Sequence, residues 1–87
     1  MLSRRVTITA HNGVHARPVA ELVRVVQAHG DAVTLRTADG VVVDLSSVLA
    51  VMDLALAPGD AVTLETRESS DAAAVLDTLS EVLAPRQ

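Results

Sequence analysis

The sequence predicts an α+β fold: a two-layer, open-faced sandwich in the order βαββαβα. It would place three helices on one face of a four-stranded, mainly antiparallel sheet. Apolar residues alternate with polar ones in four short segments, which is the period of half-buried strands. Between them, apolar residues recur every three or four positions, the period of one-sided helices. Short connections favour antiparallel strands, and one-sided helices favour covering a single face of the sheet.

The first half of the chain supplies a strand, a helix and a hairpin. Alternation over residues 6–10 predicts the first strand, which ends before Asn12-Gly13. A helix follows from Ala16 and closes near Gly30, since glycine favours helix C-termini. Its apolar stripe consists of Val19, Leu22, Val23 and Val26. Residues 33–36 and 41–45 then alternate on either side of Asp39-Gly40, a signal for a two-residue hairpin loop.

The second half supplies two helices and a strand. Ser46 or Ser47 can cap a short helix over residues 48–54, because a serine oxygen accepts a bond from an unpaired first-turn amide. The turn Pro58-Gly59-Asp60 leads into a fourth strand around Val62 and Leu64. A last helix starts at Ser69, Ser70 or Asp71 and ends before Pro85. Its core-facing residues are Val75, Leu76, Leu79 and Val82, and Asp71, Asp77 and Glu81 are expected on its solvated face. We expect one domain over residues 1–87.

The composition excludes several classes of function. The chain is 49% apolar but has no Phe, Tyr or Trp, so no aromatic ring is available to stack on nucleic-acid bases. Its net charge of −4 repels a phosphate backbone, and we expect no nucleic-acid partner. Without cysteine there is no disulfide and no thiolate chemistry. No segment approaches a signal-peptide core or the roughly 20 apolar residues of a membrane span. We therefore expect a cytoplasmic protein without direct membrane insertion.

The segment around His15 carries the chemistry. His15 directly precedes the predicted helix, whose first amides have no internal partner and whose dipole is positive at this end. A phosphoryl group on His15 could accept hydrogen bonds from the amides of Ala16 and Arg17. The Arg17 guanidinium adds a planar fork that suits phosphate oxygens. Pro18 is tolerated in a first turn, and a neutral imidazole is nucleophilic. The pattern predicts a site that accepts phosphate reversibly.

The other histidines predict no metal site. His11 and His15 are four residues apart, but Asn12-Gly13 lies between them, so the spacing is not that of a helix. No cysteine or nearby carboxylate completes a ligand set. His11 is expected in a loop and His29 at a helix end, close to the negative end of the dipole.

The string Gly13-Val14-His15-Ala16-Arg17-Pro18 resembles Gly-Leu-His-Ala-Arg-Pro, the active-site pattern of the HPr family of the sugar phosphotransferase system. Residues 39–52 resemble that family's hairpin and serine-bearing second helix, and residues 58–64 its fourth strand. The resemblance implies that His15 is phosphorylated on Nδ1 by enzyme I, with phosphoenolpyruvate as ultimate donor. His15 would pass the phosphoryl group to an enzyme IIA domain, with Arg17 steadying it in both transfers. It also implies a monomer without cofactor, which is not an independent enzyme.

The resemblance implies two further functional features. Ser47 aligns with a serine that an ATP-dependent kinase modifies in some members, although Ser46 stands where lysine is common and either serine can be a simple cap. The partner-binding residues would be Arg24, Val48, Leu49 and Met52. Two other functions remain open: a carrier in a nitrogen-type or regulatory phosphorelay, and a docking module that has lost phosphotransfer.

Overall fold

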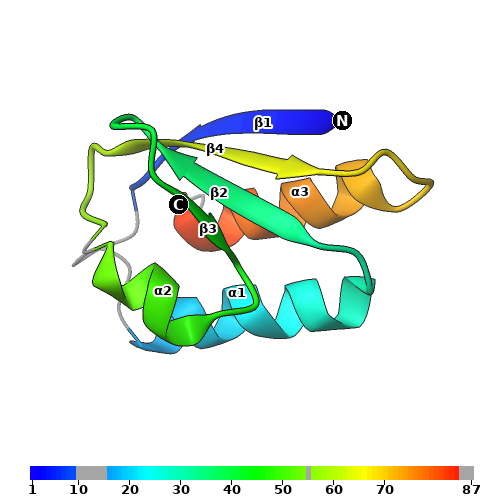
Figure 1. Cartoon of the computed structure of the whole chain (residues 1–87), viewed down its shortest axis with the longest axis horizontal. Helices are drawn as coiled ribbons and strands as arrows, with labels where there is room; N and C mark the ends of the chain where they lie inside the picture. The colour runs from blue at the N-terminus through cyan, green and yellow to red at the C-terminus, as the bar shows by residue number, and fades with distance from the viewer. Residues whose placement is uncertain (10–15, 55, 85–87) are drawn as a thin grey trace.

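The computed structural model describes residues 1–9, 16–54 and 56–84, with the backbone alone at 16–18 and 48. The elements are β1 (Leu2–Thr7), α1 (Ala16–His29), β2 (Val33–Thr37), β3 (Val42–Asp44), α2 (Val48–Asp53), β4 (Ala61–Thr66) and α3 (Ala72–Leu83). The strands form one sheet in the order β1-β4-β2-β3, and each pairing among them is antiparallel. Figure 1 shows the three helices on the same side of this sheet. The predicted open-faced sandwich is confirmed.

The core lies between the sheet and the helices and is built from valine, leucine and isoleucine. In the sheet, β4 runs between β1 and β2, so that Leu64 is opposite Arg4 on one side and Leu35 on the other. From the helices, the predicted stripe of α1 is buried along its whole length: Val19, Leu22, Val23 and Val26. Helix α3 adds three buried leucines to this core: Leu76, Leu79 and Leu83. Many small aliphatic contacts replace the aromatic side chains that the sequence lacks.

The hairpin between β2 and β3 differs from the prediction. Its loop has three residues, 38–40, because the Thr37 amide donates to the Val41 carbonyl at 2.9 Å. The Gly40 amide donates to the Thr37 carbonyl at 3.0 Å, and Gly40 has φ +91°. A three-residue loop that ends in a left-handed glycine is the next most common hairpin after the two-residue loop. The Asp-Gly signal therefore located the turn but gave the wrong loop length.

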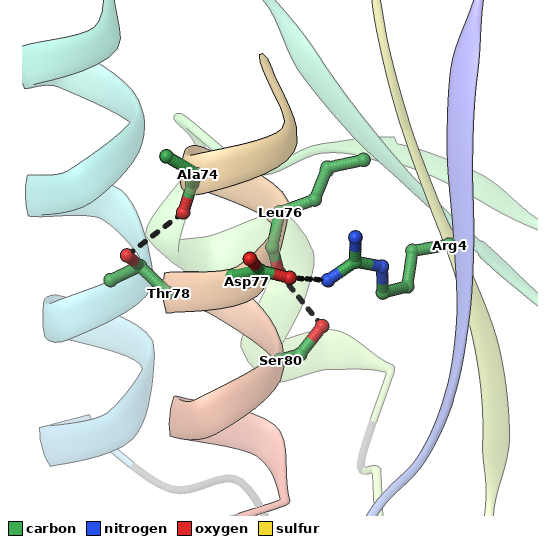
Figure 2. Close-up of polar contacts among 6 residues, drawn as sticks. All are labelled: Arg4, Ala74, Leu76, Asp77, Thr78 and Ser80. Carbon is green, nitrogen blue, oxygen red and sulfur yellow. Dashed lines mark hydrogen bonds and ion pairs between the residues drawn. The ribbon is translucent and has the colours of Figure 1, made fainter. Parts of the chain in front are cut away.

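The first strand is also displaced from its prediction. β1 covers Leu2–Thr7, whereas the alternation indicated residues 6–10. The charged residue Arg4 hid the earlier start, because it lies on the helix-covered side of β1. Its guanidinium forms an ion pair with Asp77 of α3, as Figure 2 shows. Asp77 is largely solvent-exposed, as expected, but it also ties α3 to the edge strand.

Two hydroxyls of α3 are satisfied within the helix itself. Thr78 Oγ1 donates to the Ala74 carbonyl at 3.0 Å, and Ser80 Oγ donates to the Leu76 carbonyl at 2.7 Å (Figure 2). Such bonds let polar side chains lie in a helix without needing a partner elsewhere. Among the described residues, no helix is long and apolar enough to cross a bilayer.

Candidate functional site

The predicted phosphate site lies at the start of α1. The helix begins at Ala16, directly after His15 in the sequence, as predicted. The backbone of Ala16 and Arg17 therefore belongs to the first turn of the helix. The amides of a first turn lack intrahelical acceptors and lie at the positive end of the helix dipole. Pro18, third in the helix, fits there because its missing amide would have been unpaired. His15 itself and the Arg17 side chain lie outside the described residues, so their roles remain predictions.

The ends of the segment that carries His15 are held by the rest of the fold. On the β1 side, the Ile8 amide donates to the Asp60 carbonyl at 2.8 Å, and the Gly59 amide donates to the Ile8 carbonyl at 2.7 Å. The Thr9 amide donates to the Leu83 carbonyl at 3.0 Å. On the helix side, α1 is anchored by Val19, which is completely buried. The chain that enters this segment is therefore fixed by hydrogen bonds to the turn before β4 and to the end of α3. The chain that leaves it is fixed by the burial of Val19.

Helix α2 lies beside the N-terminal half of α1 (Figure 1). Ser47 is its N-cap: the Ser47 Oγ accepts a hydrogen bond from the Ala50 amide at 3.3 Å, and its backbone is extended (φ −101°, ψ 104°). Ser46 is not the cap, and its Oγ instead donates to Asp44 Oδ1 at 2.7 Å. The structure thus resolves which of the two serines begins the helix.

The outer side of α2 carries apolar side chains that the core does not cover. Leu49 is 76% exposed and Met52 is 42% exposed, whereas Val51 is buried in the core. The side chain of Val48 lies outside the described residues. We call Leu49 and Met52 the α2 apolar surface. Large apolar residues that are exposed together are typical of a surface that binds other proteins.

Arg24 lies on the exposed side of α1, eight residues after the helix begins. Its guanidinium forms two bonds to Glu21, with Nη2–Oε1 at 2.7 Å and Nε–Oε2 at 3.2 Å. The bonds and the charge of Glu21 raise the pKa of Arg24 above its ordinary value. Glu21 therefore orients Arg24 and offsets its charge, a partner that the sequence analysis did not consider.

Asp44 forms polar contacts just before α2 that the sequence analysis missed. Its Oδ1 accepts from the Ser46 amide at 2.8 Å as well as from the Ser46 hydroxyl. These bonds, the amide first, lower the pKa of the Asp44 carboxyl below its ordinary value. The signal was present in the sequence, because Asp commonly accepts from an amide two residues ahead. Asp44 therefore holds a negative charge at the corner that leads into the Ser47 cap.

The structure assigns His29 to the last residue of α1, as expected. Both ring nitrogens are inaccessible to solvent and have no hydrogen-bond partner within the described part of the chain. Those same residues contain no group of three or more His, Asp or Glu side chains that could hold a metal ion. His11 lies outside the described residues.

Comparison with known proteins identifies relatives over nearly the whole chain. The family described as "PTS HPr component phosphorylation site" matches residues 2–84. The phosphocarrier protein HPr of Streptomyces coelicolor is 37% identical over 84 residues, covering 97% of this chain and 89% of that protein. The HPr of Haloferax volcanii is 35% identical over 83 residues, covering 94% and 92%. The crystal structure of an HPr from Bacillus anthracis superposes with a TM-score of 0.83 at 30% identity, covering 94% of this chain and 95% of that one.

Proposed function

The chain belongs to the HPr family of phosphocarriers, and on that premise we propose that His15 receives a phosphoryl group from enzyme I and delivers it to an enzyme IIA domain. The start of α1 at Ala16, directly after His15, is the observation that carries the proposal. A phosphoryl group on His15 would meet first-turn amides and the positive end of a 14-residue helix. The exchange takes place in the cytoplasm.

The chemistry requires no cofactor. The neutral imidazole attacks the phosphorus of the phosphorylated donor through Nδ1, and the N–P bond forms as the bond from phosphorus to the donor breaks. Delivery reverses the roles: a nucleophile on enzyme IIA attacks the phosphorus, and His15 leaves as neutral imidazole. Because one bond replaces another at each step, no oxidant or further reactant is needed.

Arg17 stabilises the phosphoryl oxygens during both transfers. Its position in the sequence supports this role, since Arg17 is the second residue of α1 and belongs to the first helical turn. A planar guanidinium can bind two oxygens at once, and it stays charged throughout the physiological pH range. Lysine could supply the charge but not the fork, so Arg17→Lys should retain only part of the transfer rate.

The partner surface consists of Arg24, Val48, Leu49 and Met52. The exposure of Leu49 and Met52 and the position of α2 beside the start of α1 support it. The flexible thioether of Met52 suits a surface that binds several partners in turn. Arg24, oriented by Glu21, would contact an acidic rim of the partner.

Ser47 is the candidate for regulation by a serine kinase. A phosphoryl group there would place a dianion at the N-terminus of α2, beside the α2 apolar surface. It would also lie close to Asp44, because the Ser47 amide donates to the Asp44 carbonyl at 3.1 Å, and the ionised Asp44 carboxyl would repel it. The cap bond from the Ala50 amide supports a structural role for the unmodified hydroxyl. Incubation with an HPr kinase and ATP, comparing wild type with Ser47→Ala and Ser46→Ala, distinguishes the two roles.

The central test is transfer from enzyme I. Purified protein is incubated with enzyme I and labelled phosphoenolpyruvate, and the label is tested for acid lability. We expect an acid-labile phosphate in wild type and none in His15→Ala, with the two proteins equally folded by circular dichroism. No label on wild type, from an enzyme I that labels another HPr, would contradict the proposal and favour a docking module. Label without delivery to any enzyme IIA would favour a regulatory relay.

A further inference from the structure

The uncovered face of the sheet carries two arginines on either side of one threonine. Thr63 of β4 is directly opposite Arg5 of β1 and directly opposite Arg36 of β2. A residue adjacent to each of them in its strand is buried against the helices: Val6, Leu64 and Leu35. Because successive side chains alternate between faces, the row Arg5–Thr63–Arg36 projects from the face without helices. We call these three residues the arginine row.

A small hollow lies at the arginine row. It has a volume of about 90 Å³ and is lined by Arg5, Arg36, Thr37, Ala38, Ala61 and Thr63. Both charged residues of this lining are cations, in a chain whose net charge is −4. The surface thus gathers positive charge locally against the overall sign of the protein. A hollow of this size suits a small ion and not a nucleotide or a peptide.

Among the described residues, neither the Arg5 nor the Arg36 guanidinium has a hydrogen-bond partner, although Arg36 forms a long ion pair with Glu65. The chain contains no lysine, so all its side-chain cations other than histidine are arginines. Those with described side chains mostly bind a carboxylate closely, as Arg67 binds Asp31 at 2.8 Å and Arg24 binds Glu21 at 2.7 Å. Arg5 has no such partner among the described residues. Arg36 Nη1 lies 3.6 Å from Glu65 Oε1, beyond hydrogen-bond distance.

We propose that the arginine row binds a small phosphate dianion, either inorganic phosphate or the terminal group of a phosphomonoester. Two strand spacings separate Arg5 from Arg36, about 10 Å between backbones, so both long side chains can converge on one anion above Thr63. Each guanidinium can bind two oxygens, and the Thr63 hydroxyl can donate to a further one. Two guanidinium groups with two positive charges match a tetrahedral dianion better than a carboxylate, because a single guanidinium can bind both oxygens of a carboxylate.

Glu65 is the local competitor for this anion. Its carboxylate is on the same strand as Thr63, two residues away, and therefore on the same face of the sheet. It weakens binding by repulsion and by its long contact with Arg36. We therefore expect an affinity of roughly millimolar order that decreases with ionic strength. The row faces away from α1, so its occupancy does not depend on His15.

The test is a titration with inorganic phosphate followed by ¹H–¹⁵N NMR, at constant ionic strength maintained with KCl. We expect saturable shifts at the Thr63 amide and at the Nε–Hε signals of Arg5 and Arg36. Arg5→Gln and Arg36→Gln should each weaken binding at least fivefold, because each removes one charge and one fork. Glu65→Gln should strengthen it, because it removes the competing carboxylate.

Two controls separate this site from general attraction and from the α1 site. Arg67→Gln makes the same charge change at an exposed arginine outside the row, and His15→Ala removes the proposed phosphoryl acceptor; both should bind phosphate as wild type does. A parallel titration with glycerol 3-phosphate distinguishes a site open to phosphomonoesters from one for the free ion. Shifts that do not saturate, an equal loss in Arg67→Gln, or loss in His15→Ala would overturn the proposal.

Discussion

Replacing Leu64 by alanine tests how the aliphatic core supports the site. Leu64 is completely buried in the central strand β4, between β1 and β2. The change removes three carbons, worth about 2.4 kcal/mol at ~0.8 kcal/mol each. The cavity left behind adds to this, so we expect a loss of about 3–4 kcal/mol in the free energy of unfolding. A chain of 87 residues typically has about 4–13 kcal/mol in total.

The assay is urea unfolding followed by far-ultraviolet circular dichroism, because the chain has no tryptophan or tyrosine for fluorescence. With a slope of about 1 kcal/mol per molar urea, the midpoint should fall by about 3–4 M. Leu49→Ala is the matched control: the same atoms are removed, but from a side chain that is 76% exposed. Its unfolding free energy should stay within about 0.5 kcal/mol of wild type.

The variants Leu64→Ala and Leu49→Ala also separate effects on stability from effects on partner binding. Leu49→Ala should slow phosphoryl transfer from enzyme I while leaving stability unchanged, because it removes apolar contact area from the α2 surface. Leu64→Ala should slow transfer only in proportion to the unfolded fraction. Equal losses of stability in the two variants, or normal transfer by Leu49→Ala, would refute this division of the chain into core and partner surface.

Three further outcomes follow from named contacts. Ser47→Ala should cost about 1 kcal/mol in unfolding free energy through loss of the α2 cap, and Ser46→Ala should cost less; a larger effect of Ser46→Ala would show that the cap is misassigned. Because the folded-state pKa of Asp44 is lowered, its stabilisation is complete above the unfolded pKa of about 3.9 and is lost as pH falls through the folded pKa. Asp44→Asn should therefore be less stable than wild type at pH 7, and the difference should narrow as pH falls below the unfolded pKa in urea unfolding; a difference that stays constant between pH 7 and pH 2 would contradict this. Asp77→Asn should cost at most about 1 kcal/mol, because its pair with Arg4 is solvent-accessible, and a larger loss in a double-mutant cycle would contradict that estimate.

The helices could be predicted from periodicity because their apolar stripes are unambiguous. The stripe of α1 and the closing Gly30 gave that helix almost to the residue. Strands were placed less well, since a two-residue period is short and tolerates a charged residue whose partner is distant. Arg4 on the covered side of β1 is stabilised by Asp77, more than 70 residues later, which no local pattern reveals.

The candidate site could be predicted only in part. The helix start at Ala16 and the exposure of Leu49 and Met52 agree with the sequence argument. The choice between Ser46 and Ser47 as cap depended on backbone geometry that both residues could adopt. The arginine row could not be predicted from the sequence, because it depends on the strand order β1-β4-β2, and strand order is set by long-range packing.

The role of His15 is tested most sharply by NMR of protein phosphorylated by enzyme I, with both imidazole and amide nitrogens observed. We expect that Nδ1 of His15 carries the phosphorus, and that the amide protons of Ala16 and Arg17 shift strongly downfield as they donate to its oxygens. A phosphoryl group on another residue, or one on His15 that leaves both amides unshifted, would contradict it.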